Sequence, residues 1–139
     1  IHPALLPAFP GMNAQSQAFQ YGVRISGCTV HFVDAGTDTG PILAQTAVPV
    51  LETDDDMTLR QRILVEEHKL LPRVLQWLAE GRVTTSPSSK GRSRVTISGV
   101  ETAFVGTPPA APAPQPSMTS TLAATLSSAG AATHRGRKS

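Results

Sequence analysis

The carboxy-terminal part of the chain limits how much of it can fold. From Thr102 onward the sequence consists mainly of Pro, Ala, Ser, Thr and Gly. Such a segment holds few large apolar side chains and cannot bury enough surface to offset the entropy of the chain. We therefore predict a folded domain over residues 1–85, a connector with a last short strand (Arg94–Ser98) over residues 86–100, and a disordered tail over residues 101–139.

Charge is distributed unevenly between these parts. Residues 1–85 contain six Lys and Arg and nine Asp and Glu, whereas residues 86–139 contain six Lys and Arg and a single Glu. The folded part is therefore acidic and the basic character belongs to the tail. The basic run His134–Lys138 could contact nucleic acid, but terminal charges of this kind are usually solvated, so nucleic acid is not an expected partner.

Three features bear on where the chain works. It has one cysteine, Cys28, which cannot form an internal disulfide and suits a reducing compartment. It has no apolar run of membrane-spanning length and no signal peptide at its start, so we expect a cytoplasmic protein without a membrane partner. Because the chain opens on Ile1 and directly on a dense motif, we interpret it as truncated, with its upstream half missing.

Apolar periodicity predicts two helices and two strands before the connector. Asn13 is expected to cap the first helix and Gly22 to end it. Acids at Asp54–Asp56 favour the start of the long second helix, and Pro72 predicts a kink within it. The predicted elements are a helix over Ala14–Tyr21, a buried strand over Gly27–Val33, a loop over Asp34–Pro41, a strand over Ile42–Val50 and a helix over Thr58–Glu80.

The opening segment, Ile1–Gly11, contains three prolines that fix the backbone at short intervals, together with apolar anchors. It predicts a rigid loop attached to a core. His2 lies on this loop, and Asp38 lies in a glycine-bearing loop after an apolar strand, where ligands bind in α/β folds. A histidine beside a carboxylate is a general acid–base device, although spacing alone does not show that the two residues meet.

Structural alternatives exist for each candidate residue. His2 could be a buried histidine bonded to backbone, and Asp38 a turn residue bonded to its own backbone. Glu67 and His68 could form a solvated helix face. We interpret His31 as a satisfied core histidine and Cys28 as buried and inert. The spacings of the histidines match no zinc signature, so no metal is expected.

Three segments together resemble the phosphoribosylglycinamide formyltransferase (glycinamide ribonucleotide transformylase) family. The opening segment Ile1–Gly11 resembles its first signature. Val30–Val33 followed by Asp38–Ile42 resembles the second, and Glu67-His68 followed by Leu71-Pro72 resembles the third. The resemblance covers residues 1 to about 83. It implies an α/β fold, in which this chain supplies the carboxy-terminal half of a Rossmann-like, parallel-rich formyltransferase sheet with a long late helix.

The resemblance also implies site residues. The catalytic histidine and aspartate fall on His2 and Asp38, and a catalytic Asn would directly precede Ile1. The residue that contacts the substrate ribose falls on Glu67, with help from the turn at Leu64, and the phosphate-binding loop would lie upstream. The folate-binding loop falls on Val33, Asp34, Ala35, Gly36, Thr37 and Asp38.

The implied reaction passes a formyl group from 10-formyltetrahydrofolate, a co-substrate, to the amine of glycinamide ribonucleotide in purine (IMP) biosynthesis. His2 acts as general acid and oxyanion donor, and Asp38 keeps it protonated, so no metal is required. Because the phosphate site and half the sheet are missing, we expect this chain alone to be inactive.

Two alternative interpretations of the protein's function remain open at this point, one within the same superfamily and one outside it. Methionyl-tRNA formyltransferase and formyltetrahydrofolate deformylase share similar loop signatures. Pro3 after His2, where the deformylase commonly has a second histidine, and the Glu67-His68 helix favour the purine enzyme. An alternative of another class is a non-catalytic fragment whose disordered tail interacts with partners.

Overall fold

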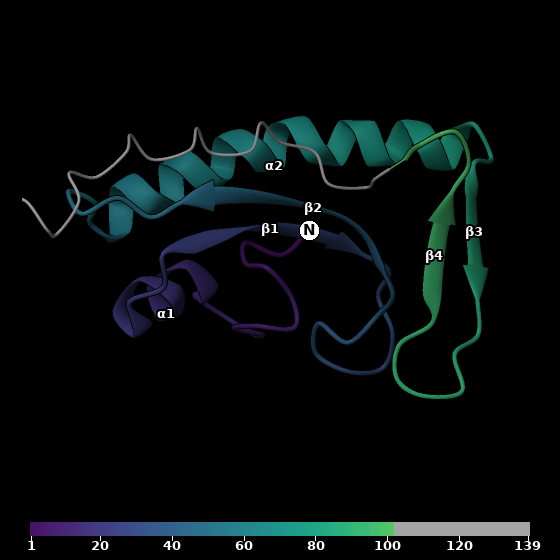
Figure 1. The fold of residues 1–139 in the computed structure, drawn as a ribbon, viewed down its shortest axis with the longest axis horizontal. Coiled ribbons are helices and arrows are strands. Elements are labelled where there is room, and N and C mark those ends of the chain that lie inside the picture. The colour runs from purple at the N-terminus through teal and green to yellow at the C-terminus, as the bar shows by residue number, and fades with distance from the viewer. Residues whose placement is uncertain (102–139) are drawn as a thin grey trace, which may run out of the picture. The chain divides into compact units, whose positions relative to one another are not determined.

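The computed structural model describes residues 1–101, and the predicted tail from residue 102 onward lies outside the described residues. These residues form an α/β fold, as predicted (Figure 1). The elements in chain order are α1 (Ala14–Tyr21), β1 (Ile25–His31), β2 (Ile42–Pro49), α2 (Asp56–Ala79), β3 (Val83–Ser86) and β4 (Arg94–Ile97).

Within the described residues, the strands form two antiparallel pairs. Strand β1 pairs with β2 from Ile25 opposite Pro49 to His31 opposite Ile42, and the register shifts between Val30 and His31. Strand β3 pairs with β4. The prediction of a parallel-rich sheet is therefore wrong for this part of the chain. A parallel pair needs a connection of roughly a dozen or more residues, usually a helix, and residues 32–41 are too few to supply it.

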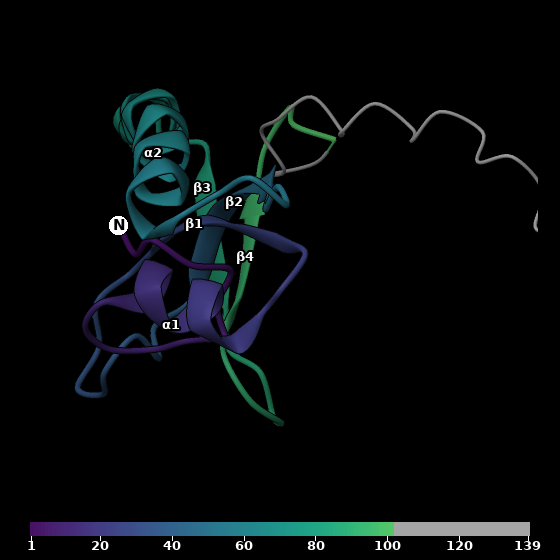
Figure 2. The same ribbon diagram turned by 90° about the vertical axis from the view of Figure 1, so that its left-hand side faces the viewer.

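The core lies between the β1–β2 pair and α2, which packs along it (Figures 1 and 2). Leu59, Ile63, Leu70 and Val74 of α2 are completely buried, as the helical spacing of the apolar residues predicts. They belong to one cluster with buried residues of the three strands β1, β2 and β4: Cys28, Val30, Leu43, Ala44, Val48 and Ile97. Cys28 is buried as predicted, and this burial raises the pKa of its thiol to about 12.

Strand β1 is buried on both of its faces from Ser26 to Val30. Cys28 and Val30 belong to the core cluster with α2. Thr29 points to the other face, where its hydroxyl contacts the opening segment of the chain at Ala4 and Leu6. Both faces of this strand are thus in use, one for the core and the other to hold the loop that carries His2.

Local signals account for the ends of α2. Asp55 is the N-cap: its carboxylate accepts a bond from the Thr58 backbone N–H (2.8 Å), and the Thr58 hydroxyl accepts one from the Asp55 N–H (2.9 Å). The helix begins at Asp56, two residues before the predicted start. It does not end at Pro72 but continues to Ala79, and the kink predicted at Pro72 stays a prediction.

Helix α1 has the predicted bounds, but Asn13 caps it differently from the prediction. Asn13 adopts a left-handed conformation (φ 56°) and makes no side-chain cap bond, since the usual N-cap interaction requires an extended backbone. Gly22 ends the helix as predicted: it is left-handed (φ 82°), and its N–H is directed to the carbonyls of Ala18 and Phe19.

Strand β3 was not predicted. Its sequence, Val83-Thr84-Thr85-Ser86, is mostly exposed, so it carries little apolar alternation. It forms by pairing with β4, which lies over Arg94–Ile97 where a last strand was predicted. The predicted connector is therefore reduced to residues 87–93, which join the two strands of a hairpin.

A half-buried ion pair at the start of α2 leads to a stability prediction. The Asp54 side chain is 3% exposed, binds the Arg62 guanidinium (Oδ1–Nη2 2.7 Å) and accepts a bond from the Leu51 N–H (2.7 Å). The bond from Arg62 is the main reason why the pKa of Asp54 lies well below its usual range. We expect Asp54→Asn to lower the free energy of unfolding at pH 7 by about 1–3 kcal/mol, since the Arg62 charge loses its partner.

The sign of the pH dependence follows from the lowered pKa. The contribution of Asp54 is complete above the pKa of an unfolded aspartate, about 3.9, and declines as the pH falls toward its folded value. The difference between wild type and Asp54→Asn in urea unfolding of the complete protein should therefore shrink below about pH 4. Asp55→Asn is the matched control, because Asn caps a helix as well as Asp does. Equal stabilities of wild type and Asp54→Asn at pH 7 would refute the prediction.

Candidate active site

The loop that carries His2 is fixed to β1 by backbone and side-chain bonds. The backbones of His2 and Thr29 exchange two hydrogen bonds of 2.8 Å each. The Thr29 hydroxyl donates to the Ala4 carbonyl (2.7 Å) and accepts from the Leu6 N–H (3.1 Å) and from the Gln45 amide (3.0 Å). The opening segment is thus attached to the core, as its prolines and apolar residues predicted.

The His2 imidazole is buried, with both ring nitrogens occupied. Its Nε2 donates to the Phe9 carbonyl at 2.8 Å, and its Nδ1 lies 3.4 Å from Oδ2 of Asp38. Because a carbonyl only accepts, Nε2 carries a proton and Nδ1 faces the carboxylate. The alternative of a buried histidine bonded to backbone is therefore half correct: one nitrogen binds backbone, and the other meets Asp38.

Asp38 lies in a tightly closed loop between β1 and β2. The Asp34 carboxylate accepts bonds from the Gly36 N–H (3.1 Å) and the Thr39 hydroxyl (2.6 Å), and the Thr39 bond is the main reason why the pKa of Asp34 is lowered. At Gly40 a side chain would collide with the Phe32 carbonyl, which lies 1.7 Å from an ideal Cβ position. These contacts fix the turn, in which Asp38 is left-handed (φ 53°).

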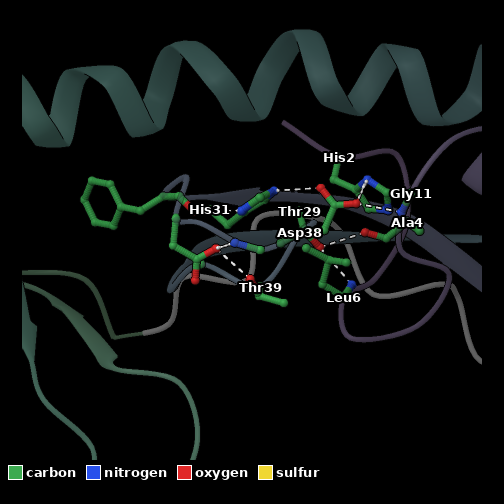
Figure 3. Close-up of polar contacts among 12 residues, drawn as sticks. His2, Ala4, Leu6, Gly11, Thr29, His31, Asp38 and Thr39 are labelled. Carbon is green, nitrogen blue, oxygen red and sulfur yellow. Dashed lines mark hydrogen bonds and ion pairs between the residues drawn. The ribbon is translucent and has the colours of Figure 1, made fainter.

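The Asp38 carboxylate reaches the opening loop instead of its own backbone. Its Oδ2 accepts a bond from the Gly11 N–H at 2.7 Å and lies beside His2. In this loop the carboxylate that accepts a bond from the backbone of its own turn belongs to Asp34 and not to Asp38. A residue from each of the two predicted catalytic loops is therefore brought into contact, as Figure 3 shows.

A second histidine, His31, lies on the other side of the same carboxylate (Figure 3). Its Nε2 is 3.5 Å from Oδ1 of Asp38, and its Nδ1 donates to the Phe32 carbonyl at 2.9 Å. His31 is thus bonded to backbone, as a satisfied histidine would be, but it also lies beside Asp38, a contact that the sequence did not predict. The sequence signal was limited to alternation, which places His31 on the same strand face as Thr29; the contact of Thr29 with the His2 loop and the register shift after Val30 are visible only in the structure.

The arrangement places one carboxylate between two imidazoles. Each imidazole donates one of its ring N–H groups to a backbone carbonyl. It can therefore donate a hydrogen bond to Asp38 only when its other ring nitrogen is also protonated. The carboxylate oxygens then accept from both sides. Separations of 3.4 and 3.5 Å are in the range of ion pairs and longer than a good hydrogen bond. The geometry suits a site that holds and moves protons, in which such bonds tighten when a substrate binds.

Glu67 and Leu64, the predicted substrate-binding residues, line a pocket of about 470 Å³ on α2. Ile1, the neighbour of His2 in the chain, lines the same pocket, as do His68, Leu71 and Pro72. Burial raises the pKa of the Glu67 carboxyl. Glu67 is half-buried, whereas His68 is exposed as the solvated-face alternative predicts, and the pocket adjoins the segment that carries His2.

The predicted folate-binding loop is mostly exposed. Residues 33–37 are exposed, and the side chain of Val33 is 90% exposed. Asp38 alone in this loop contacts His2 and His31. Among residues 1–101 there is no group of three or more His, Cys, Asp and Glu residues arranged to hold a metal ion. Neither of the two described helices is long and apolar enough to cross a membrane.

The fold and this site define a class of protein. The family model described as formyl transferase matches residues 1–75, more than half of the chain. The chain therefore belongs to the formyl transferase family, which confirms the resemblance found in the three sequence signatures.

The individual proteins that resemble this chain have more specific names than the family model. Phosphoribosylglycinamide formyltransferase of Mycobacterium tuberculosis is 59% identical over 83 residues, which are 60% of this chain and 39% of that protein. The crystal structure of phosphoribosylglycinamide formyltransferase from Anaplasma phagocytophilum matches with a TM-score of 0.68 and 41% identity, over 75% of this chain and 49% of that one. This chain thus spans less than half of each of these relatives.

A relative with another printed activity is also similar in fold. The crystal structure of a formyltetrahydrofolate deformylase from Pseudomonas syringae matches with a TM-score of 0.62 and 29% identity, over 69% of this chain and 30% of that one. The fold by itself therefore does not separate the two activities, but the sequence identity is higher to the phosphoribosylglycinamide formyltransferases.

Proposed function

We propose that the complete protein containing these residues transfers a formyl group from 10-formyltetrahydrofolate to the amine of glycinamide ribonucleotide, a step of purine biosynthesis. The observation that carries the proposal is the contact of His2 with Asp38 in a member of the formyl transferase family. The names of the relatives at 59% and 41% identity support the particular substrate pair.

The chemistry of formyl transfer needs what these side chains offer. When an amine attacks a formyl carbon, negative charge develops on the formyl oxygen and a proton must leave the nitrogen. Protonated His2 can donate its Nε2–H to that oxygen, and then pass the proton to the departing folate nitrogen, once this N–H exchanges the Phe9 carbonyl for the substrate. Asp38 stabilises the imidazolium through Nδ1. Thr29 and Gly11 already hold the His2 loop and the Asp38 carboxylate in place, and the change required is the release of the Nε2–H from the Phe9 carbonyl.

His31 gives Asp38 a second partner for a proton. Because its Nε2 faces Oδ1 while His2 faces Oδ2, the carboxylate can accept from both imidazoles without moving. We assign to His31 the role of orienting Asp38 and of sharing the proton released by the amine. Glu67, with Leu64, binds the ribonucleotide in the pocket on α2, and residues 33–38 hold the folate.

The alternatives make different products. A deformylase releases formate from the same folate without an amine acceptor, and the methionyl-tRNA enzyme formylates an aminoacyl-tRNA. Pro3 after His2 and the identities to the named purine enzymes favour the small ribonucleotide acceptor. The expected partners are thus two small molecules, and the single buried thiol at Cys28 supports a cytoplasmic location.

The test is an assay of the complete protein with 10-formyltetrahydrofolate and glycinamide ribonucleotide, in which both formylated ribonucleotide and free formate are measured. We expect the formylated product to dominate and to depend on the ribonucleotide. Release of formate without transfer would overturn the proposal in favour of a deformylase. The 139-residue chain alone should form no product, because it spans 39% of the Mycobacterium tuberculosis relative.

A further inference from the structure

The β3–β4 hairpin reaches the loop that carries Asp38. From the connection between its strands, Arg92 donates through Nη2 to the Asp38 carbonyl (2.7 Å) and through Nη1 to the Gly40 carbonyl (3.2 Å). One planar guanidinium thus binds the backbone on both sides of Thr39. The two carbonyls are adjacent acceptors that match the fixed fork of an arginine.

These bonds act on a backbone position that needs support. Asp38 has a left-handed φ of 53°, a conformation that L-residues adopt less readily than the right-handed one and that persists when its surroundings determine it. The carboxylate is held by the Gly11 N–H, and the loop is closed by Asp34 and Thr39. Arg92 adds the contact that fixes the Asp38 carbonyl, and therefore the direction in which its side chain leaves the backbone.

The charge of Arg92 is not used in an ion pair within the described part of the chain. Its guanidinium donates to two backbone carbonyls, the side chain is half-buried, and its charge contributes to the lowered pKa of Asp34 in the same loop. Its neighbour Arg94 carries the same charge two residues further on, is exposed, and makes no side-chain bond to residues 1–101. Arg92 therefore differs from Arg94 in its two bonds to the loop and in the nearness of its charge to Asp34.

We propose that Arg92 is a positioning residue for the formyl transfer, holding the backbone of Asp38 so that its carboxylate lies between His2 and His31. The inference rests on the proposed function. It extends the catalytic machinery beyond residues 1–75, which the family model matches, to a hairpin whose first strand the sequence did not predict.

The test compares Arg92→Ala, Arg92→Lys and two controls in the complete protein. We expect Arg92→Ala to lower kcat by about 10- to 100-fold, since small misplacements of a catalytic group have effects of this order, while the KM for the ribonucleotide changes by less than about threefold. Arg92→Lys should recover part of the rate, because an ammonium group can donate to these carbonyls without the paired geometry.

Arg94→Ala removes the same charge from the same hairpin and should leave kcat unchanged. Arg82→Ala removes a guanidinium that binds the Ser98 carbonyl and Glu80, so it controls for destabilisation of the hairpin. All variants are assayed below the onset of unfolding, where a merely structural role of Arg92 would not change kcat. A kcat of Arg92→Ala equal to that of Arg94→Ala would overturn the inference.

A second readout separates this inference from the proposed function. Amide hydrogen exchange over residues 34–40 should increase in Arg92→Ala and not in Arg94→Ala, whichever reaction the protein catalyses. If the wild type forms no formylated ribonucleotide, the proposed function fails. If the wild type is active but Arg92→Ala has normal kcat and normal exchange, the positioning role fails while the function stands.

Discussion

Replacing His2 by alanine should lower kcat for formyl transfer by the complete protein by about two to four powers of ten, the combined range of acid–base and oxyanion contributions. The His2 imidazole is the side chain of the opening loop that faces the Asp38 carboxylate, through its Nδ1. Its removal takes away the proton donor and leaves Asp38 without this partner. The measurement is steady-state kinetics with saturating folate and ribonucleotide.

A second substitution separates this chemistry from the structural role of the ring. His2→Gln keeps an amide N–H that can donate to the Phe9 carbonyl, as the Nε2–H does at 2.8 Å in the wild type. It provides no ring proton that can be passed on. We expect it to be as slow as His2→Ala while unfolding at a temperature nearer to that of the wild type. Undiminished turnover of either variant would show that His2 is not the acid.

Asp38→Asn is expected to lower kcat by about two to three powers of ten, with a small effect on stability. Asn tolerates the left-handed backbone at this position, and its carbonyl oxygen can still accept the bond from the Gly11 N–H. What the substitution removes is the negative charge between the imidazoles of His2 and His31. The loss should therefore appear in the chemical step rather than in folding.

Kinetics and unfolding are compared with Asp55→Asn, which removes one carboxylate charge at the start of α2 and keeps a good helix cap. That variant should retain the wild-type kcat. If Asp38→Asn were equally active, the carboxylate would have no part in the reaction. If its rate fell only in proportion to the folded fraction, the role of Asp38 would be structural.

The sequence was a good guide to elements with local signals. The spacing of Leu59, Ile63, Leu70 and Val74 placed α2, and Gly22 placed the end of α1. It was a poor guide to strand pairing, which depends on partners distant in the chain: the antiparallel pairing of β1 with β2 contradicted the expectation taken from the resemblance. Strand β3 escaped prediction because its exposed, polar residues acquire their structure from β4.

The candidate site was predictable only in part, for a similar reason. Spacing could not show that His2 and Asp38 meet, and the resemblance supplied that expectation. The contact depends on the Thr29 bonds to the opening loop and on a left-handed turn at Asp38, and neither is visible in composition. His31 and Arg92 were missed because their partners, a carboxylate oxygen and two backbone carbonyls, come into reach only once the loops are folded.

A double-mutant cycle on His2 and Asp38 tests most directly whether these residues act as one unit. The values of kcat are measured for wild type, His2→Ala, Asp38→Ala and the double variant of the complete protein. If the carboxylate works through the imidazole, the double variant should be about as slow as His2→Ala alone. If instead the two losses multiply, the residues act independently and the proposed acid–base pair is wrong.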